Sequence, residues 1–148
     1  MNIGFDLDGT VLEQSIGLLR VMNALPDAKQ DELLKYYVSG LKMNLNPLDF
    51  LADGDELFFI TGRSNCVIET TTKWVKKYFP YAKLFLTNVE VTEDKVINFY
   101  QAQVKTKSEI INKEKIDVYF EDNPDVVKGL RQVCPNTRII QYGSRCYL

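Results

Sequence analysis

Short apolar runs alternate along the chain with segments in which apolar residues recur every three or four positions. The short runs are bounded by turn-forming or charged residues, a pattern typical of buried parallel strands. They predict strands at 3–6, 57–61, 83–87, 118–120 and 138–142. The intervening pattern predicts helices at 64–78, 106–113 and 125–133, the last of them after an Asn-Pro pair that is typical of a helix start.

This alternation predicts an α/β fold, a Rossmann-like doubly wound parallel sheet with crossover helices. Residues 12–56 are too long for one crossover, and their apolar positions predict two helices separated by Pro26. We therefore expect a core of residues 1–11 and 57–148, with 12–56 as a small helical cap insertion after the first strand. Residues 88–103 mix charged and apolar positions and predict no clear element.

Composition narrows the class of protein. A chain of 148 residues with 45% hydrophobic and 26% charged residues is typical of one soluble globular domain. Its net charge of −2 gives no basic footprint for nucleic acid, and no apolar run approaches the roughly 20 residues that span a bilayer. The first predicted strand leaves no room for a signal peptide, so we expect a cytoplasmic protein whose cysteines (Cys66, Cys134 and Cys146) are reduced.

The chain contains no histidine, so carboxylates, lysines and hydroxyls must carry any chemistry. The first strand runs into "DLDGT", where Asp6 and Asp8 are two residues apart and are expected to project together, with Leu7 turned to the core. Gly9 leaves space for a ligand beside the backbone, and Thr10 adds a hydroxyl. Two adjacent carboxylates need a divalent cation or a retained proton. The alternative is an ordinary Asp-Gly turn.

Two other predicted strands also end in polar residues. "LFFITGRS" ends in Thr61, Gly62 and Arg63, a hydroxyl followed by amides that are expected to open a helix, which suits an anion. Thr61 as a simple helix cap is the alternative. "VYFEDNPD" ends in Glu121 and Asp122, again an apolar run that leads into acids.

A lysine at the predicted start of the helix 106–113 is poorly placed against the helix dipole. Lys107 is therefore a candidate site residue, with Lys105 as its rival. A solvated surface lysine is the alternative for either of them.

Taken in order, "DLDGT", "TGR", a lysine and "EDNPD" resemble the haloacid dehalogenase-like superfamily of phosphotransferases over nearly the whole chain. The resemblance implies that Asp6 is a nucleophile that forms an aspartyl-phosphate. It implies that Asp8 protonates the leaving group and later activates water. Thr61 and Lys107 would bind phosphoryl oxygens, and Thr10, Gly62 and Arg63 are further candidate substrate-binding residues.

The same resemblance implies a Mg²⁺ cofactor held by Asp6, Asp122 and the backbone carbonyl of Asp8, with Glu121 in support. Asp125 is the alternative to Glu121. An acid two residues after the nucleophile is typical of the phosphatases of this superfamily. The expected function is therefore hydrolysis of a phosphomonoester.

The small cap and the "EDNP" ending look similar to the 5′(3′)-deoxyribonucleotidase-like branch, which implies a nucleoside monophosphate as the small phosphorylated partner. Another small phosphorylated metabolite, a polynucleotide end, or a catalytically idle binding protein of the same fold are the alternatives. A receiver-type signalling domain would carry its phosphorylated aspartate after the third strand, but "KLFLTN" ends without an acid.

Overall fold

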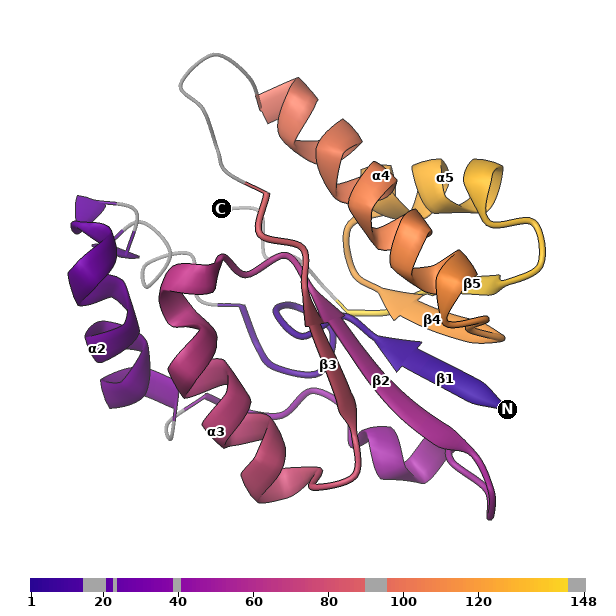
Figure 1. Cartoon of the computed structure of the whole chain (residues 1–148), viewed down its shortest axis with the longest axis horizontal. Coiled ribbons are helices and arrows are strands. Elements are labelled where there is room, and N and C mark those ends of the chain that lie inside the picture. The colour runs from indigo at the N-terminus through magenta and orange to yellow at the C-terminus, as the bar shows by residue number, and fades with distance from the viewer. Residues whose placement is uncertain (15–20, 23, 39–40, 90–95, 144–148) are drawn as a thin grey trace.

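A computed structural model of the chain describes residues 1–14, 21–22, 24–38, 41–89 and 96–143 (Figure 1). Its centre is a parallel sheet of five strands in the order β3-β2-β1-β4-β5. The strands are β1 (Asn2–Phe5), β2 (Glu56–Thr61), β3 (Lys83–Leu86), β4 (Val118–Glu121) and β5 (Arg138–Gln141). This confirms the predicted α/β fold with a doubly wound parallel sheet.

The labelled helices are α2 (Asp27–Val38), α3 (Ile68–Tyr78), α4 (Val96–Lys113) and α5 (Pro124–Val133), with short 3₁₀ turns η1 (Pro47–Phe50) and η2 (Asn65–Val67). Asn123 caps α5, because its side chain accepts hydrogen bonds from the amides of Asp125 and Val126. In the part of the chain that is described, no helix has the length and apolarity needed to cross a membrane.

Helix α4 differs from its prediction, because it begins at Val96 rather than at 106. The helical repeat was not recognised in the sequence because a polar residue, Gln103, lies between the apolar positions Tyr100 and Val104. In the structure Gln103 is itself buried. As a result, Lys107 lies in the interior of α4 and not at a helix start, which corrects the helix-dipole argument made from the sequence.

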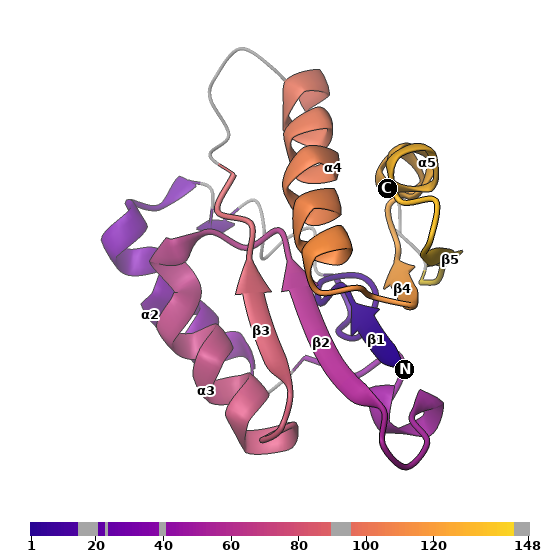
Figure 2. The same cartoon turned by 45° about the vertical axis from the view of Figure 1, so that its right-hand side comes forward.

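Alternating residues of β2 pack into two hydrophobic cores on opposite faces of the sheet. Leu57 and Phe59 belong to one cluster, which α3 completes with Trp74, whereas Phe58 belongs to the other, which α4 and α5 cover. Figure 2 shows α3 on one side of the sheet and α4 and α5 on the other. Burial of one such apolar side chain stabilises the fold by about 1.5–3 kcal/mol. The helices are thereby fixed on both faces.

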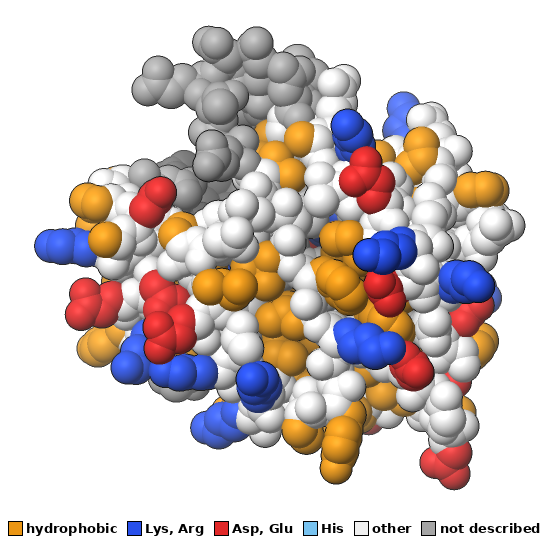
Figure 3. Space-filling model, viewed as in Figure 1, with side chains coloured by type: hydrophobic (Ala, Val, Ile, Leu, Met, Phe, Trp, Pro, Cys, Tyr) orange, Lys and Arg blue, Asp and Glu red, His pale blue; other side chains and the backbone are white. Residues whose placement is uncertain are grey.

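Strand β3 is an edge of the sheet, and it runs between α3 and α4. In the space-filling view, apolar side chains gather along this part of the surface (Figure 3). Leu84 packs partly against the first core and Phe85 partly against the second. Lys83 at the start of the strand forms an ion pair with Glu56, a charged feature that is common on edge strands.

The segment 12–56 is divided between two places. Helix α2 follows Pro26 and contacts η2 and α3. The second half returns to the sheet, where Leu45 is buried in the first core and the ring of Phe50 lies 5.9 Å from that of Phe5. The first predicted helix of this segment falls largely on 15–20 and 23, outside the described residues.

The topology creates a crevice between β1 and β4. From β1 the chain leads to β2 and β3 on one side, then crosses to β4 and β5 on the other. The ladder continues one bond beyond β1, from the Asp6 amide to the Phe120 carbonyl (2.9 Å). Ligand sites of open α/β sheets form at this kind of switch point, beyond the carboxyl ends of the strands.

Candidate active site

A cleft of about 1110 Å³ opens at the carboxyl edge of the sheet. Its walls come from the residues after β1, β2 and β4 and from helices α2 and α4. The predicted site residues all line this cleft except Thr10 and Thr61, which are buried. The fold therefore gathers most of the predicted chemistry in one place.

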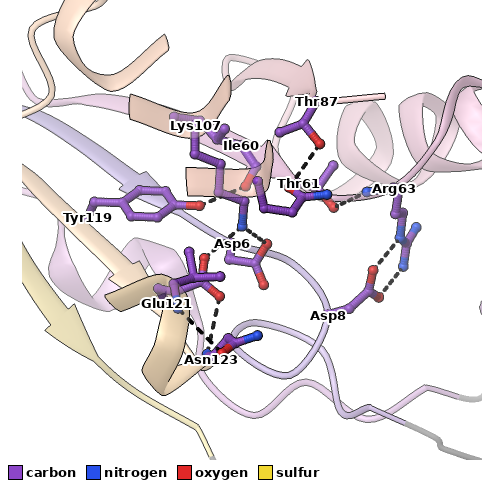
Figure 4. A network of polar contacts seen from close by, with 12 residues as sticks. Asp6, Asp8, Ile60, Thr61, Arg63, Thr87, Lys107, Tyr119, Glu121 and Asn123 are labelled. Carbon is purple, nitrogen blue, oxygen red and sulfur yellow. Dashed lines mark hydrogen bonds and ion pairs between the residues drawn. The ribbon is translucent and has the colours of Figure 1, made fainter. Parts of the chain in front are cut away.

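Lys107 reaches from α4 into the crevice between β1 and β4 (Figure 4). Its ammonium lies 2.9 Å from a carboxylate oxygen of Asp6 and 2.6 Å from one of Glu121, and its side chain is 5% exposed. Burial alone would lower the pKa of Lys107, but Asp6 and Glu121 outweigh burial and raise it well above the ordinary value. Lys105 is exposed. Of the two rival lysines, only Lys107 is thus placed beside the carboxylates, as a permanent cation.

Asp6, Glu121 and Asp122 form a buried carboxylate cluster in which one oxygen of each lies within 4.8 Å of the others. Burial, followed by repulsion from Glu121, raises the pKa of Asp6 to about 7. Burial also raises the pKa of Glu121, despite the attraction of Lys107. Three ionised carboxylates beside one ammonium would leave a net charge of −2, which a divalent cation would balance. An all-oxygen donor set of this kind fits Mg²⁺.

Gly9 is required for this cluster to form. Its φ of +89° lies in the region that favours glycine, and a Cβ there would come within 2.7 Å of the Asp122 carboxyl carbon. The predicted space beside the Gly9 backbone is therefore used by the Asp122 carboxylate. Asp125, the alternative to Glu121, is exposed and lies outside the cluster.

Asp6 and Asp8 both line the cleft, and the charge of Asp8 acts on Asp6. Strand β1 ends at Phe5, so both aspartates lie directly after the strand. The two aspartates have different partners, because Asp8 forms two hydrogen bonds with the Arg63 guanidinium, of 2.8 Å and 2.7 Å (Figure 4). Burial would raise the pKa of Asp8, but Arg63 outweighs it and holds this pKa below the ordinary value. Leu7 is fully buried, as predicted.

The helix predicted at 64–78 is divided in two. Residues 62–64 form a loop, η2 begins at Asn65 after the N-cap Ser64, and α3 begins at Ile68. The hydroxyl of Thr61 accepts a hydrogen bond from the Arg63 amide (3.3 Å). Thr10 is fully buried, and within the described residues its hydroxyl has no hydrogen-bond partner.

Two polar residues that the sequence did not single out complete the site. Thr87 follows β3, and its hydroxyl donates a hydrogen bond of 3.0 Å to the side-chain carbonyl of Gln103 on α4. The Thr87 amide donates to the Thr61 carbonyl (2.9 Å), so it lies beside the end of β2. A hydroxyl at the end of the third predicted strand was the available signal for Thr87. Gln103 has a weaker signal, its position four residues before Lys107.

The cysteines are compatible with the predicted reduced state. Cys66 is partly buried at the cleft and Cys134 is buried in the second core, and both are free thiols. Cys146 lies outside the described residues.

Sequence comparison finds related proteins along almost the entire chain. No family model matches it. The chain is 30% identical over 160 residues to a class B acid phosphatase of Rahnella sp. (strain Y9602), and 28% identical over 162 residues to one of Enterobacter sp. (strain 638). These alignments include 98% and 99% of the chain, which spans 65% of the length of each curated relative.

Comparison of folds points the same way. A HAD-superfamily hydrolase of subfamily IA, variant 1, from Geobacter sulfurreducens PCA superposes with a TM-score of 0.56 at 10% identity, covering 95% of this chain and 86% of that one. HAD stands for haloacid dehalogenase. The chain therefore has the fold of this HAD-superfamily hydrolase and a sequence similar to those of class B acid phosphatases.

Proposed function

We propose that this protein is a Mg²⁺-dependent phosphomonoester hydrolase that uses Asp6 as its nucleophile. The observation that carries the proposal is the position of Asp6 at the β1–β4 crevice, in contact with Lys107 and within the carboxylate cluster. The similarity to class B acid phosphatases supports the same reaction class.

The carboxylates of Asp6 and Asp122 would hold Mg²⁺, together with the backbone carbonyl of Asp8 and with Glu121 in support. When bound, the cation supplies charge stabilisation to the phosphoryl group. Lys107 adds a fixed positive charge next to Asp6, and its ion pair with Glu121 holds the ammonium in place. A positioned cation of this kind stabilises the charge that develops on phosphoryl oxygens in the transition state.

The chain's own residues can complete both half-reactions. An Asp6 oxygen attacks phosphorus, the ester P–O bond breaks, and the leaving oxygen takes a proton from Asp8. Water then attacks the aspartyl-phosphate, Asp8 accepts the proton of that water, and the Asp6 carboxylate is restored. The Asp8–Arg63 pair favours the ionised form of Asp8, which suits the second half-reaction. Before the first half-reaction, Asp8 must take up a proton, and its hydrogen bonds to Arg63 must weaken.

For the substrate we propose a small phosphomonoester, with nucleoside monophosphates as the first class to test. The division into a core and a cap of residues 12–56 also stays a proposal. Helix α2 supports it, since Gln30 and Leu34 of α2 line the cleft. A lid at this position would exclude water and select the leaving group.

Phosphate release is the test of the reaction. The panel holds nucleoside monophosphates, sugar phosphates, an aryl phosphate and an oligonucleotide with a terminal phosphate, each with and without Mg²⁺. We expect Mg²⁺-dependent release by the wild type and loss of at least about 10³-fold in Asp6→Asn, which lacks the nucleophile. Asp125→Asn is the matched control, because Asp125 is an exposed aspartate outside the carboxylate cluster. Absence of release by the wild type from every ester would favour the idle binding protein.

A further inference from the structure

Helix α4 presents a line of side chains to the cleft. Phe99, Gln103 and Lys107 follow one another at intervals of four residues and all line the cavity. Residues at this spacing lie on one face of a helix, about 6 Å apart along its axis. The first turns of α4 extend beyond the carboxyl ends of β2 and β3 (Figure 2). Gln103 and then Phe99 therefore lie progressively farther from the sheet than Lys107.

Gln103 carries a buried hydrogen-bond donor without an acceptor. The side chain is 3% exposed, and among the described residues its amide nitrogen Nε2 has no partner. An unpaired buried donor of this kind lowers the equilibrium constant for folding about tenfold or more. An apolar residue of similar size would avoid that penalty. The donor is therefore better explained by a bound molecule than by packing.

One hydrogen bond orients the Gln103 amide. Its carbonyl oxygen accepts the hydrogen bond from Thr87, which leaves Nε2 on the opposite side. Nε2 lies over Gly62, where an added Cβ would stand only 3.0 Å from it. Gly62 precedes Arg63, the partner of Asp8, and lines the same cleft. The unpaired donor thus lies against the loop that carries Arg63, the partner of the proposed acid–base group.

In-line displacement places the leaving oxygen on the side of phosphorus opposite the nucleophile. Asp6 lies at the end of β1 and Lys107 lies beside it. The leaving alcohol therefore extends away from the sheet, along α4. We propose that α4 forms a leaving-group subsite in which the Nε2–H of Gln103 donates to an oxygen of the alcohol and the Phe99 ring packs against a planar group beyond it. This rests on the proposed phosphatase function and specifies its substrate as an ester of an oxygenated alcohol that carries a ring, as in nucleoside monophosphates.

Two esters with primary-alcohol leaving groups test the subsite. Adenosine 5′-monophosphate carries the sugar oxygens and the base, whereas ethyl phosphate carries neither. We expect the wild type to prefer adenosine 5′-monophosphate, and we expect Gln103→Leu to lower kcat/KM for it about tenfold, the value of one hydrogen bond. For ethyl phosphate the change should stay within about twofold. Phe99→Ala should show the same selective loss.

The controls separate binding from structure. Gln101→Leu makes the same change on the exposed side of α4 and should leave both esters unaffected. Gln103→Glu keeps the size and an oxygen for the Thr87 hydroxyl but lacks the donor, so it tests the proposal if Gln103→Leu fails to fold. An equal loss for both esters would assign Gln103 to the phosphoryl group or to packing and overturn the subsite. No loss in either variant, or a wild-type preference for ethyl phosphate, would also overturn it.

Failure of the phosphatase function itself is distinguishable from failure of the subsite. If the wild type releases phosphate from no ester, calorimetry with a nucleoside 5′-phosphonate, in which carbon replaces the bridging oxygen, tests binding without turnover. A dissociation constant that rises about tenfold in Gln103→Leu supports the subsite. An unchanged constant, or no binding to the wild type, overturns it.

Discussion

The guanidinium of Arg63 holds the carboxylate of Asp8 through two parallel hydrogen bonds of 2.8 Å and 2.7 Å. A third bond, from Arg63 to the Thr71 hydroxyl on α3 (3.0 Å), fixes the guanidinium itself. This fork arrangement is the strong form of ion pair and orients both planar groups. The loop after β2 therefore positions Asp8, although Asp8 belongs to the segment after β1.

A double-mutant cycle measures that relationship. Arg63→Met, Asp8→Asn and the double variant should give a coupling free energy of about 1–3 kcal/mol in urea unfolding, because the Arg63 side chain is only 7% exposed. The pair Lys73–Glu69 on α3, whose side chains are 67% and 69% exposed, is the control and should couple far more weakly. Equal coupling in the two pairs would contradict the structural role of Arg63.

Lys107→Met removes the buried cation of the carboxylate cluster. We expect the metal-free variant to lose about 3–5 kcal/mol of unfolding free energy, because Asp6 and Glu121 are left buried without their ammonium partner. Mg²⁺ should restore part of that stability by supplying charge to the same oxygens. Lys105→Met, on the exposed side, should show neither effect. Identical unfolding curves for the two variants would disprove this placement of Lys107.

Gly9 and Gly54 allow a matched comparison of backbone strain. Both have positive φ, +89° and +88°, but a Cβ at Gly9 collides with Asp122, whereas one at Gly54 meets nothing within 4 Å. Gly54→Ala should therefore cost about 1 kcal/mol for the backbone alone, and Gly9→Ala clearly more. Gly9→Ala should also weaken Mg²⁺ binding in calorimetry, since it displaces Asp122. Equal Mg²⁺ affinity in the two variants would refute the link between Gly9 and the metal site.

The two described thiols should differ in reactivity. Cys134 is 1% exposed in the second core, and burial raises the pKa of its thiol, whereas Cys66 lines the cleft. Only the thiolate reacts readily with iodoacetamide, so in the folded protein Cys66 should be modified first. Mass spectrometry of the peptides gives the two rates, and urea should bring them together. Faster modification of Cys134 would mean that α5 does not pack as described.

The sequence predicted correctly the features that depend on short stretches of the chain. The five strands were found within two residues at each end, because buried parallel strands are short apolar runs. Asp6, Glu121 and Asp122 stay predicted site residues, and the structure brings together these carboxylates, each of which follows an apolar run. The resemblance to the haloacid dehalogenase-like superfamily followed from the order of these motifs along the chain.

Other features depend on how distant segments meet. The ion pair of Asp8 depends on an arginine 55 residues away. The choice between Lys107 and Lys105 depends on the rotation of α4 against the sheet. Gln103 is a neutral residue, and only its burial and its missing partner in the described structure mark it as a site residue.

The sequence by itself thus determined the alternation of strands and helices and the types of the candidate reacting groups, because periodicity and residue type are properties of short stretches. Only the tertiary structure decided which carboxylate faces which cation and where the leaving group can lie. Those relations depend on distances of a few ångströms between side chains from different strands and helices, and packing of the two cores against the sheet sets those distances.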